Sequence, residues 1–201
     1  AKVLFPKGRV AERQRAQLTT WGENIESYEV DGSFDDCQKM VKEAFMDKSI
    51  TENLSSSNSI NIGRLLPQMA YYAYASQLYL DMYGKKPVII VPSGNVGNVT
   101  GCFWAKAMGS PIERIVMATN ANRTIPDYLE SGEYQPRASV KTLANAMDVG
   151  APSNMERLFD MFPTFEDFSQ AVSARSVSDS EIQRTIKEVY EEDNYIICPH
   201  T

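Results

Sequence analysis

Residues 88–98 read VIIVPSGNVGN, an apolar run that leads directly into a loop of glycine and asparagine. The apolar run predicts a buried strand. Residues 99–108 predict a helix that ends at Gly109, and residues 112–118 predict the next strand. A strand, a helix and a second strand in this order form a βαβ crossover, so this part of the chain is predicted to be a parallel α/β sheet.

The loop between the first strand and the helix is predicted to bind a phosphate group. Gly94 and Gly97 allow close approach of the main chain. Consecutive free N–H groups in such a loop form an anion cradle, and the N-terminus of the helix adds partial positive charge. The loop is neither a Walker A motif nor a G-x-G-x-x-G dinucleotide fingerprint. The alternative is a tight turn in which the asparagines act only as turn formers.

The rest of the chain extends this α/β pattern in both directions. The first fifty residues predict strand, helix, strand and helix at 2–5, 9–18, 25–30 and 34–45. Ser33 is a good N-cap for the second of these helices, with Asp36 three residues on. The later predictions are a loop at 51–63 that crosses between lobes, a helix at 65–83 that stops at Gly84, and helices near 154–162, 164–173 and 179–193.

Composition excludes several classes of partner and site. The chain has 201 residues and a net charge of -6, without a cluster of Lys and Arg, so nucleic acid is not an expected partner. No apolar run approaches the roughly 20 residues of a membrane helix, so no membrane partner is expected. The single histidine, His200, excludes a multi-His metal site, and no metal is predicted. Three cysteines without motif spacing favour a reducing, cytoplasmic compartment.

Five stretches resemble the threonine synthase family, in order and over essentially the whole chain. Ser93 to Asn98 is similar to the family's loop for the phosphate of pyridoxal phosphate (PLP), and Asn58 to Arg64, NSINIGR, resembles its segment for the substrate phosphate. The other three similar stretches are DGSFDDC at 31–37, ATNAN at 118–122 and NAMDV at 145–149.

The resemblance implies a fold-type-II PLP enzyme with the tryptophan synthase β-like fold, which converts O-phosphohomoserine and water to threonine and phosphate. Residues 1–50 would be the C-terminal part of the smaller α/β lobe, and residues 51–201 an incomplete cofactor-phosphate lobe. The residues implied for the PLP phosphate are Gly94, Asn95, Val96, Gly97 and Asn98. Those implied for the substrate are Ser59, Asn61, Arg64 and Asn98.

Several family features are missing from the sequence. No Phe-Lys-Asp stretch is present, so the Schiff-base lysine is not expected in this chain. The upstream Ser-Gly-Asp-Thr-Gly loop and the stretch that meets the pyridine nitrogen are also missing. Both ends are expected to be cut from a longer parent chain, and the segment alone is expected to be inactive. Where the family has Asp in an Asn-x-Asn-Asp-Thr stretch, this chain has Arg123, so no family role is carried over to position 123.

Two alternatives remain open. One is another fold-type-II PLP enzyme, such as a cysteine synthase or a dehydratase. The other is a non-catalytic module that binds a phosphorylated metabolite. Three further residues invite a catalytic interpretation, but each is better explained by structure: Lys106 as helix surface, Cys102 as packing and His200 as a structural histidine.

Overall fold

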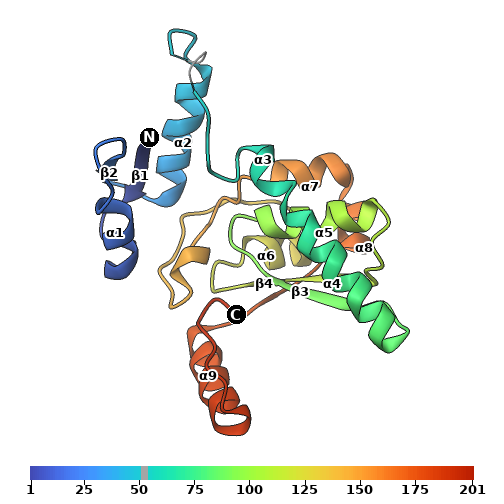
Figure 1. The fold of residues 1–201 in the computed structure, drawn as a ribbon. Helices are drawn as coiled ribbons and strands as arrows, with labels where there is room; N and C mark the ends of the chain where they lie inside the picture. Colours follow the sequence, from blue (N-terminus) through green and yellow to red (C-terminus); the bar gives the residue numbers. More distant parts are fainter. Residues whose placement is uncertain (51–53) are drawn as a thin grey trace.

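The computed structural model describes residues 1–50 and 54–201. These residues form two parallel sheets, of two and three strands, with helices around them (Figure 1). The strands are β1 (Lys2–Pro6), β2 (Glu26–Val30), β3 (Val88–Pro92), β4 (Arg114–Thr119) and β5 (Ser173–Ser176). The helices are α1 (Glu12–Thr19), α2 (Phe34–Met46), α3 (Ile62–Leu65), α4 (Gln68–Tyr83), α5 (Gly97–Ala107), α6 (Thr124–Ser131), α7 (Met155–Met161), α8 (Phe165–Ala171) and α9 (Asp179–Asp193), with a short 3₁₀ helix, η2 (Asn145–Met147).

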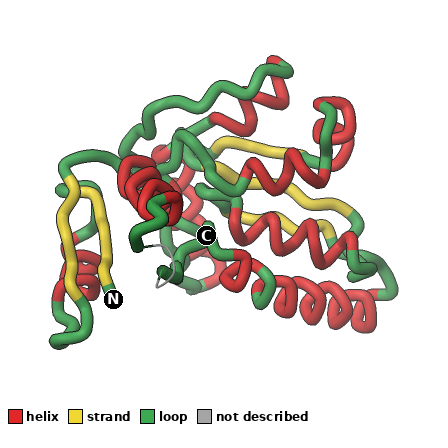
Figure 2. Tube along the Cα trace, turned by 90° about the horizontal axis from the view of Figure 1, so that it is seen from above, coloured by secondary structure: helices red, strands yellow, loops and turns green. Residues whose placement is uncertain are grey.

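The smaller sheet comes from the first thirty residues. Strands β1 and β2 pair in parallel, from Lys2 opposite Glu26 to Pro6 opposite Val30, with α1 as their crossover. Helix α2 then begins with a capping box, in which Ser33 Oγ accepts from the Asp36 N–H and the Asp36 side chain accepts from the Ser33 N–H. The predicted alternation and the predicted cap are both confirmed. Figure 2 shows the smaller sheet lying apart from the larger one.

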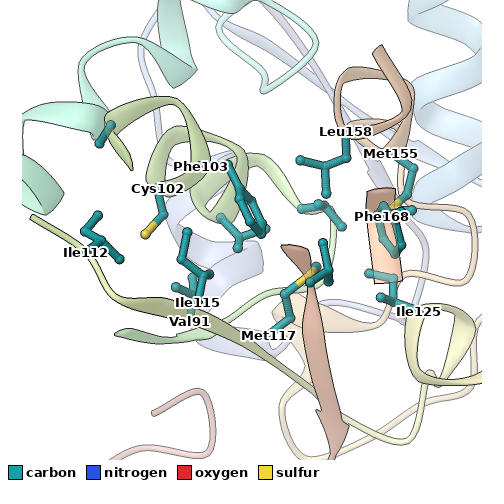
Figure 3. Close-up of a cluster of buried hydrophobic side chains, with 14 of the residues drawn as sticks. Val91, Cys102, Phe103, Ile112, Ile115, Met117, Ile125, Met155, Leu158 and Phe168 are labelled. Atoms are coloured by element: carbon teal, nitrogen blue, oxygen red, sulfur yellow. The ribbon is translucent and has the colours of Figure 1, made fainter. Parts of the chain in front are cut away.

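The larger sheet has the order β3-β4-β5 and is parallel throughout. Val88 lies opposite Arg114 and Pro92 lies opposite Ala118, so the carboxyl ends of β3 and β4 reach the same edge. Alternate side chains of each strand face the helices, where Val91, Ile115 and Met117 are at most 2% exposed. They pack with Cys102 and Phe103 of α5 and with Leu158 and Phe168 (Figure 3).

The long helix predicted at 65–83 is two helices in the structure. Helix α3 ends at Leu65 and α4 begins at Gln68, because Pro67 has no N–H to continue the hydrogen-bond ladder. Gly84 ends α4 in the left-handed conformation, at a φ of 67°, as the sequence predicts. The predicted loop at 51–63 includes residues 51–53, which lie outside the described residues, and α3 begins inside the remainder at Ile62.

Three elements were not anticipated: strand β5, helix α6 and the short 3₁₀ helix η2. The helix predicted at 164–173 ends at Ala171, and the chain continues as β5, whose Ser173 pairs with Val116 of β4. Ser-Ala-Arg-Ser has no β-branched residue, so this strand is specified by pairing rather than by propensity. Helix α6 is also absent from the sequence expectations, although Gly132 ends it in the left-handed conformation. Among the helices that the structure describes, none is long and apolar enough to cross a membrane.

Candidate phosphate site

The site begins where β3 turns into α5. Ser93 N–H donates to the Ala118 carbonyl at 2.9 Å, which keeps the strand end paired to β4. Val96 then adopts a left-handed conformation, at a φ of 65°, and α5 starts at Gly97. This conformation is unfavourable for a β-branched residue, and it is held because the Val96 side chain is fully buried. The chain therefore turns from strand to helix in four residues.

The main-chain N–H groups of this turn lack an acceptor in the part of the chain that the structure describes. Over residues 1–50 and 54–201, no acceptor is found for the N–H groups of residues 94–98. The next N–H groups are satisfied, since Val99 donates to Asn98 Oδ1 at 2.9 Å and Thr100 to the Val96 carbonyl at 3.0 Å. Orphan N–H groups at a helix N-terminus attract an anion, and the glycine loop extends the row. The turn has the donor set that a phosphate dianion requires.

Gly94 is needed because another segment lies against it. A Cβ atom at Gly94 would lie 2.6 Å from Met147 Cα and 2.9 Å from the Met147 carbonyl oxygen. Met147 belongs to η2, so the loop and η2 are in main-chain contact. A Cβ at Gly97 would lie 3.2 Å from Ser59 Cβ. Both glycines therefore allow neighbouring segments of the protein, at Met147 and at Ser59, to lie against the loop.

A buried polar network holds η2 in place. One carboxylate oxygen of Asp148 accepts from Asn120 Nδ2 at 2.8 Å and from Thr142 Oγ1 at 2.7 Å, and the other accepts from the Thr142 N–H at 3.0 Å. Asn122 Nδ2 also lies 3.3 Å from Asp148. The stretches at 118–122 and 145–149, which were singled out separately, thus contact each other. Their shared role in the structure is to place Met147 over Gly94.

A cavity of about 520 Å³ lies between α1 and the loop segments that contain Ser59, Asn95 and Asp148. It brings together Ser59, Arg64 and Asn95, three of the residues that the resemblance implies for ligand binding. Arg9 and Lys141 line the same cavity, and sequence reasoning missed both because isolated cations in loops carry no motif. Three cationic side chains around one cavity favour an anionic ligand.

The other two implied substrate residues use their side chains within the protein. Asn61 caps α3, with its Oδ1 accepting from the Gly63 N–H at 2.9 Å and its Nδ2 donating to the Ser56 carbonyl at 2.7 Å. Asn98 Oδ1 accepts from Ser93 Oγ at 2.6 Å, and its Nδ2 donates to the Pro92 carbonyl at 2.7 Å. Asn61 does not line the cavity, and Asn98 offers its main-chain N–H rather than a free side chain.

Three residues singled out in the sequence have structural partners. Lys106 is exposed on α5 and its Nζ donates to the Glu113 carbonyl at 2.7 Å, as expected for helix surface. His200 Nε2 accepts from the Ala146 N–H at 3.1 Å, which is a structural contact. The Arg123 guanidinium pairs with Asp127 and Glu130, both on α6.

The cysteines differ in a way that a labelling experiment can check. Burial raises the pKa of Cys102 to about 12 and also raises the pKa of Cys37, so both thiols stay protonated. Cys198 is exposed, and the Thr201 hydroxyl and nearby main-chain groups lower its pKa. We expect iodoacetamide at pH 7.5 to modify Cys198 first, with Cys37 and Cys102 labelled only after unfolding, as read by peptide mass spectrometry. Early labelling of Cys102 would contradict its packing role.

Comparison with known proteins gives one family over the whole chain. The family model described as "Pyridoxal-phosphate dependent enzyme" matches residues 1–201. The threonine synthase of Buchnera aphidicola subsp. Acyrthosiphon pisum is 42% identical over 200 residues, which are 98% of this chain and 46% of that protein. The Escherichia coli threonine synthase is 38% identical, with the same coverage of each. The chain spans about half the length of these curated relatives.

Solved structures agree with the sequence comparison. The crystal structure of E. coli threonine synthase superposes with a TM-score of 0.87 at 38% identity, over 99% of this chain and 47% of that one. The PLP-bound threonine synthase from Brucella melitensis gives 0.82 at 33% identity, over 99% and 49%. Maize serine racemase gives 0.62 at 18% identity and so shows the fold alone. The predicted α/β fold and the resemblance to threonine synthases are confirmed.

Proposed function

The chain belongs to the family of pyridoxal-phosphate-dependent enzymes, and from this premise we propose that it is a segment of a longer threonine synthase. The whole enzyme would convert O-phosphohomoserine and water to L-threonine and phosphate. Support comes from relatives named threonine synthase that are 38–42% identical along nearly all of this chain. The other half of the parent chain is then the partner of this segment.

We assign the PLP phosphate to the turn formed by Gly94, Asn95, Val96, Gly97 and Asn98. The observation that carries this assignment is the row of main-chain N–H groups at 94–98, which have no acceptor among the described residues and lie at the carboxyl end of β3 and the N-terminus of α5. The turn fits a phosphate dianion because it offers donors, a helix N-terminus and no carboxylate. When bound, PLP withdraws electrons from the α-carbon of the substrate. The residues of this chain anchor and orient it.

The substrate phosphate is assigned to the cavity beside this turn. The Arg64 guanidinium matches phosphate oxygens bidentately, and Ser59 supplies a hydroxyl next to it. Asn61 shapes the segment between them as the cap of α3, whereas Asn98 does not line this cavity and its main-chain N–H belongs to the turn that we assign to PLP. Lys141 and Arg9 complete a cationic lining that suits a second phosphate.

The catalytic lysine is assigned to the part of the parent chain outside residues 1–201. In this division, residues 1–50 complete the smaller lobe and residues 51–201 form most of the cofactor-phosphate lobe. Lys141 lines the cavity together with Asp148. It does not lie in a Phe-Lys-Asp stretch, so we do not assign it as the Schiff-base lysine. We also propose a reducing, cytoplasmic location, which the three free cysteines favour.

The cavity also bears on the two alternatives. A cysteine synthase or a dehydratase acts on an amino acid and needs one phosphate site for PLP, whereas Arg64, Arg9 and Lys141 line a cavity that we assign to a second phosphate. A non-catalytic phosphometabolite module would share both sites. It differs from the enzyme only in the parent chain, where it would have no Phe-Lys-Asp stretch.

Phosphate release separates these functions. We expect the full-length protein encoded by the parent gene to release phosphate from O-phosphohomoserine in the presence of PLP, and the 201-residue chain to release none, because it contributes anchors but no lysine base. A malachite green assay measures phosphate release from O-phosphohomoserine and from O-phosphoserine as a comparison substrate, and a 2-oxo-acid assay measures turnover of L-threonine. Turnover of threonine but not of O-phosphohomoserine by the full-length protein would assign a dehydratase instead.

A further inference from the structure

Asn154 lies at the start of α7 and joins the two proposed phosphate sites. It is 1% exposed, and no sequence motif marks it. Its Nδ2 donates to the carbonyl oxygen of Asn95, in the loop, at 2.9 Å and to Ser59 Oγ at 3.1 Å. One buried amide group therefore contacts the cofactor loop and the substrate segment at once.

Arg157 fixes the orientation of the Asn154 side-chain amide, because its guanidinium can only donate hydrogen bonds. Arg157 Nε donates to Asn154 Oδ1 at 3.0 Å, and a guanidinium has no acceptor atom. The Asn154 Nδ2 must therefore face Ser59. Arg157 is held in turn, since its Nη2 donates to the Ile60 carbonyl at 2.9 Å.

Asn95 is oriented in the same way from the other side. Its Oδ1 accepts from the Ser153 main-chain N–H at 2.7 Å, and a main-chain N–H is also a donor only. The Asn95 Nδ2 consequently faces Ser59 Oγ, at 2.9 Å. Two amide groups with fixed orientation thus donate to one hydroxyl oxygen.

These two donors determine the polarity of the Ser59 hydroxyl. A serine hydroxyl has two lone pairs and one hydrogen, and both lone pairs are occupied by Asn95 and Asn154. The hydrogen is left to donate, and its acceptor in the structure is Asn58 Oδ1 at 3.2 Å, a long hydrogen bond. A phosphate oxygen in the cavity is a stronger acceptor than that amide oxygen.

We propose that Asn154 and Arg157 are positioning residues, which set the Ser59 hydroxyl as a donor to the phosphate group of the substrate. Neither residue lines the cavity of Ser59 and Arg64, so each acts through Ser59. The inference rests on the proposed function, because it takes the ligand of that cavity to be a phosphorylated amino acid.

The variant Asn154→Asp tests the polarity with little change in shape. The carboxylate keeps the contact with Arg157 but accepts from Ser59, so the hydroxyl hydrogen turns away from the cavity. It also loses the hydrogen bond to the Asn95 carbonyl, and this part of the effect does not depend on the Ser59 hydroxyl. The probe is 2-amino-5-phosphonopentanoate, in which CH₂ replaces the ester oxygen so that phosphate cannot leave. We expect its Kd for the full-length PLP-loaded enzyme, measured by calorimetry, to rise about 30-fold, in the range of a lost hydrogen bond to a charged group. Asn194→Asp, at the end of α9, is the charge control and should leave the Kd unchanged.

A double-mutant cycle with Ser59→Ala separates positioning from a general structural effect. If Asn154 acts through the hydroxyl, Asn154→Asp should raise the Kd by about threefold or less once Ser59 is alanine. Arg157→Met, which has no donor, should raise the Kd about fivefold in the same Ser59-dependent way, and Arg157→Lys should restore most of it. Circular dichroism checks the fold of each variant.

The outcomes distinguish the two levels of the proposal. If Asn154→Asp raises the Kd by the same factor whether residue 59 is serine or alanine, the positioning role is wrong and the proposed function still stands. An unchanged Kd for Asn154→Asp leads to the same conclusion. If the wild-type enzyme itself does not bind the phosphonate, the proposed function fails, and the inference fails with it.

Discussion

The replacement Gly94→Ala is expected to weaken PLP binding by about 100-fold, because a main-chain contact leaves no room for a methyl group. The added Cβ would lie 2.6 Å from Met147 Cα, and neither atom belongs to a flexible side chain. The loop can accept the methyl group only by moving away from η2, which displaces the N–H groups at 94–98 from their common focus. Fluorescence titration of the full-length protein with PLP measures the effect.

A matched glycine provides the control for this prediction. Gly22 has no atom within 4 Å of an ideal Cβ, and its φ lies outside the left-handed region, so Gly22→Ala should leave the Kd for PLP unchanged. Gly94 likewise has no positive φ, and the expected loss is therefore due to contact rather than to backbone strain. If Gly94→Ala binds PLP with the wild-type Kd, the contact between the loop and η2 is not needed to position the N–H groups of residues 94–98.

The replacement Asp148→Ala is expected to lower the free energy of unfolding by about 3 kcal/mol. The carboxylate accepts from Asn120, from Asn122 and twice from Thr142, and the side chains of all three donor residues are at most 9% exposed. Asn120 and Asn122 keep other acceptors, but the Thr142 N–H and hydroxyl lose theirs. Each unpaired buried donor costs roughly 1–3 kcal/mol, partly offset where a water enters. Urea unfolding followed by circular dichroism measures the loss.

The same variant should also weaken PLP binding, because Asp148 holds the segment that packs on Gly94. Asp160→Ala, an exposed position on α7, is the control and should change stability by less than about 0.5 kcal/mol. A stability change in Asp148→Ala as small as in Asp160→Ala would mean that the network contributes little to the fold.

Much of the fold follows from local pattern. The apolar run at 88–91 and the glycine loop after it predicted β3, α5 and their parallel partner, and Ser33 predicted the start of α2. Strand β5 could not be predicted, because Ser173 to Ser176 becomes a strand only through its pairing with β4. The break between α3 and α4 arises because Pro67 has no N–H. Pro67 is visible in the sequence, but a single helix also tolerates a proline in its first turn, so the sequence did not predict the break.

Some residues of the site could be predicted from the sequence and others could not. The resemblance brought out Ser59, Arg64 and Asn95, and the structure places them around one cavity. Asn154 and Arg157 carry no motif, since their roles arise from orienting other side chains across nearly a hundred residues of sequence. No one-dimensional pattern records such contacts.

The central claim is that the main-chain N–H groups of residues 94–98 bind the phosphate of PLP. Titration of the ¹⁵N-labelled chain with PLP, followed by two-dimensional ¹H–¹⁵N NMR, observes these groups directly. We expect the amide resonances of Gly94 to Asn98 to shift downfield with one common Kd, and inorganic phosphate to shift the same set. If those five resonances stay in place while others move, the cofactor phosphate binds elsewhere and the account is wrong.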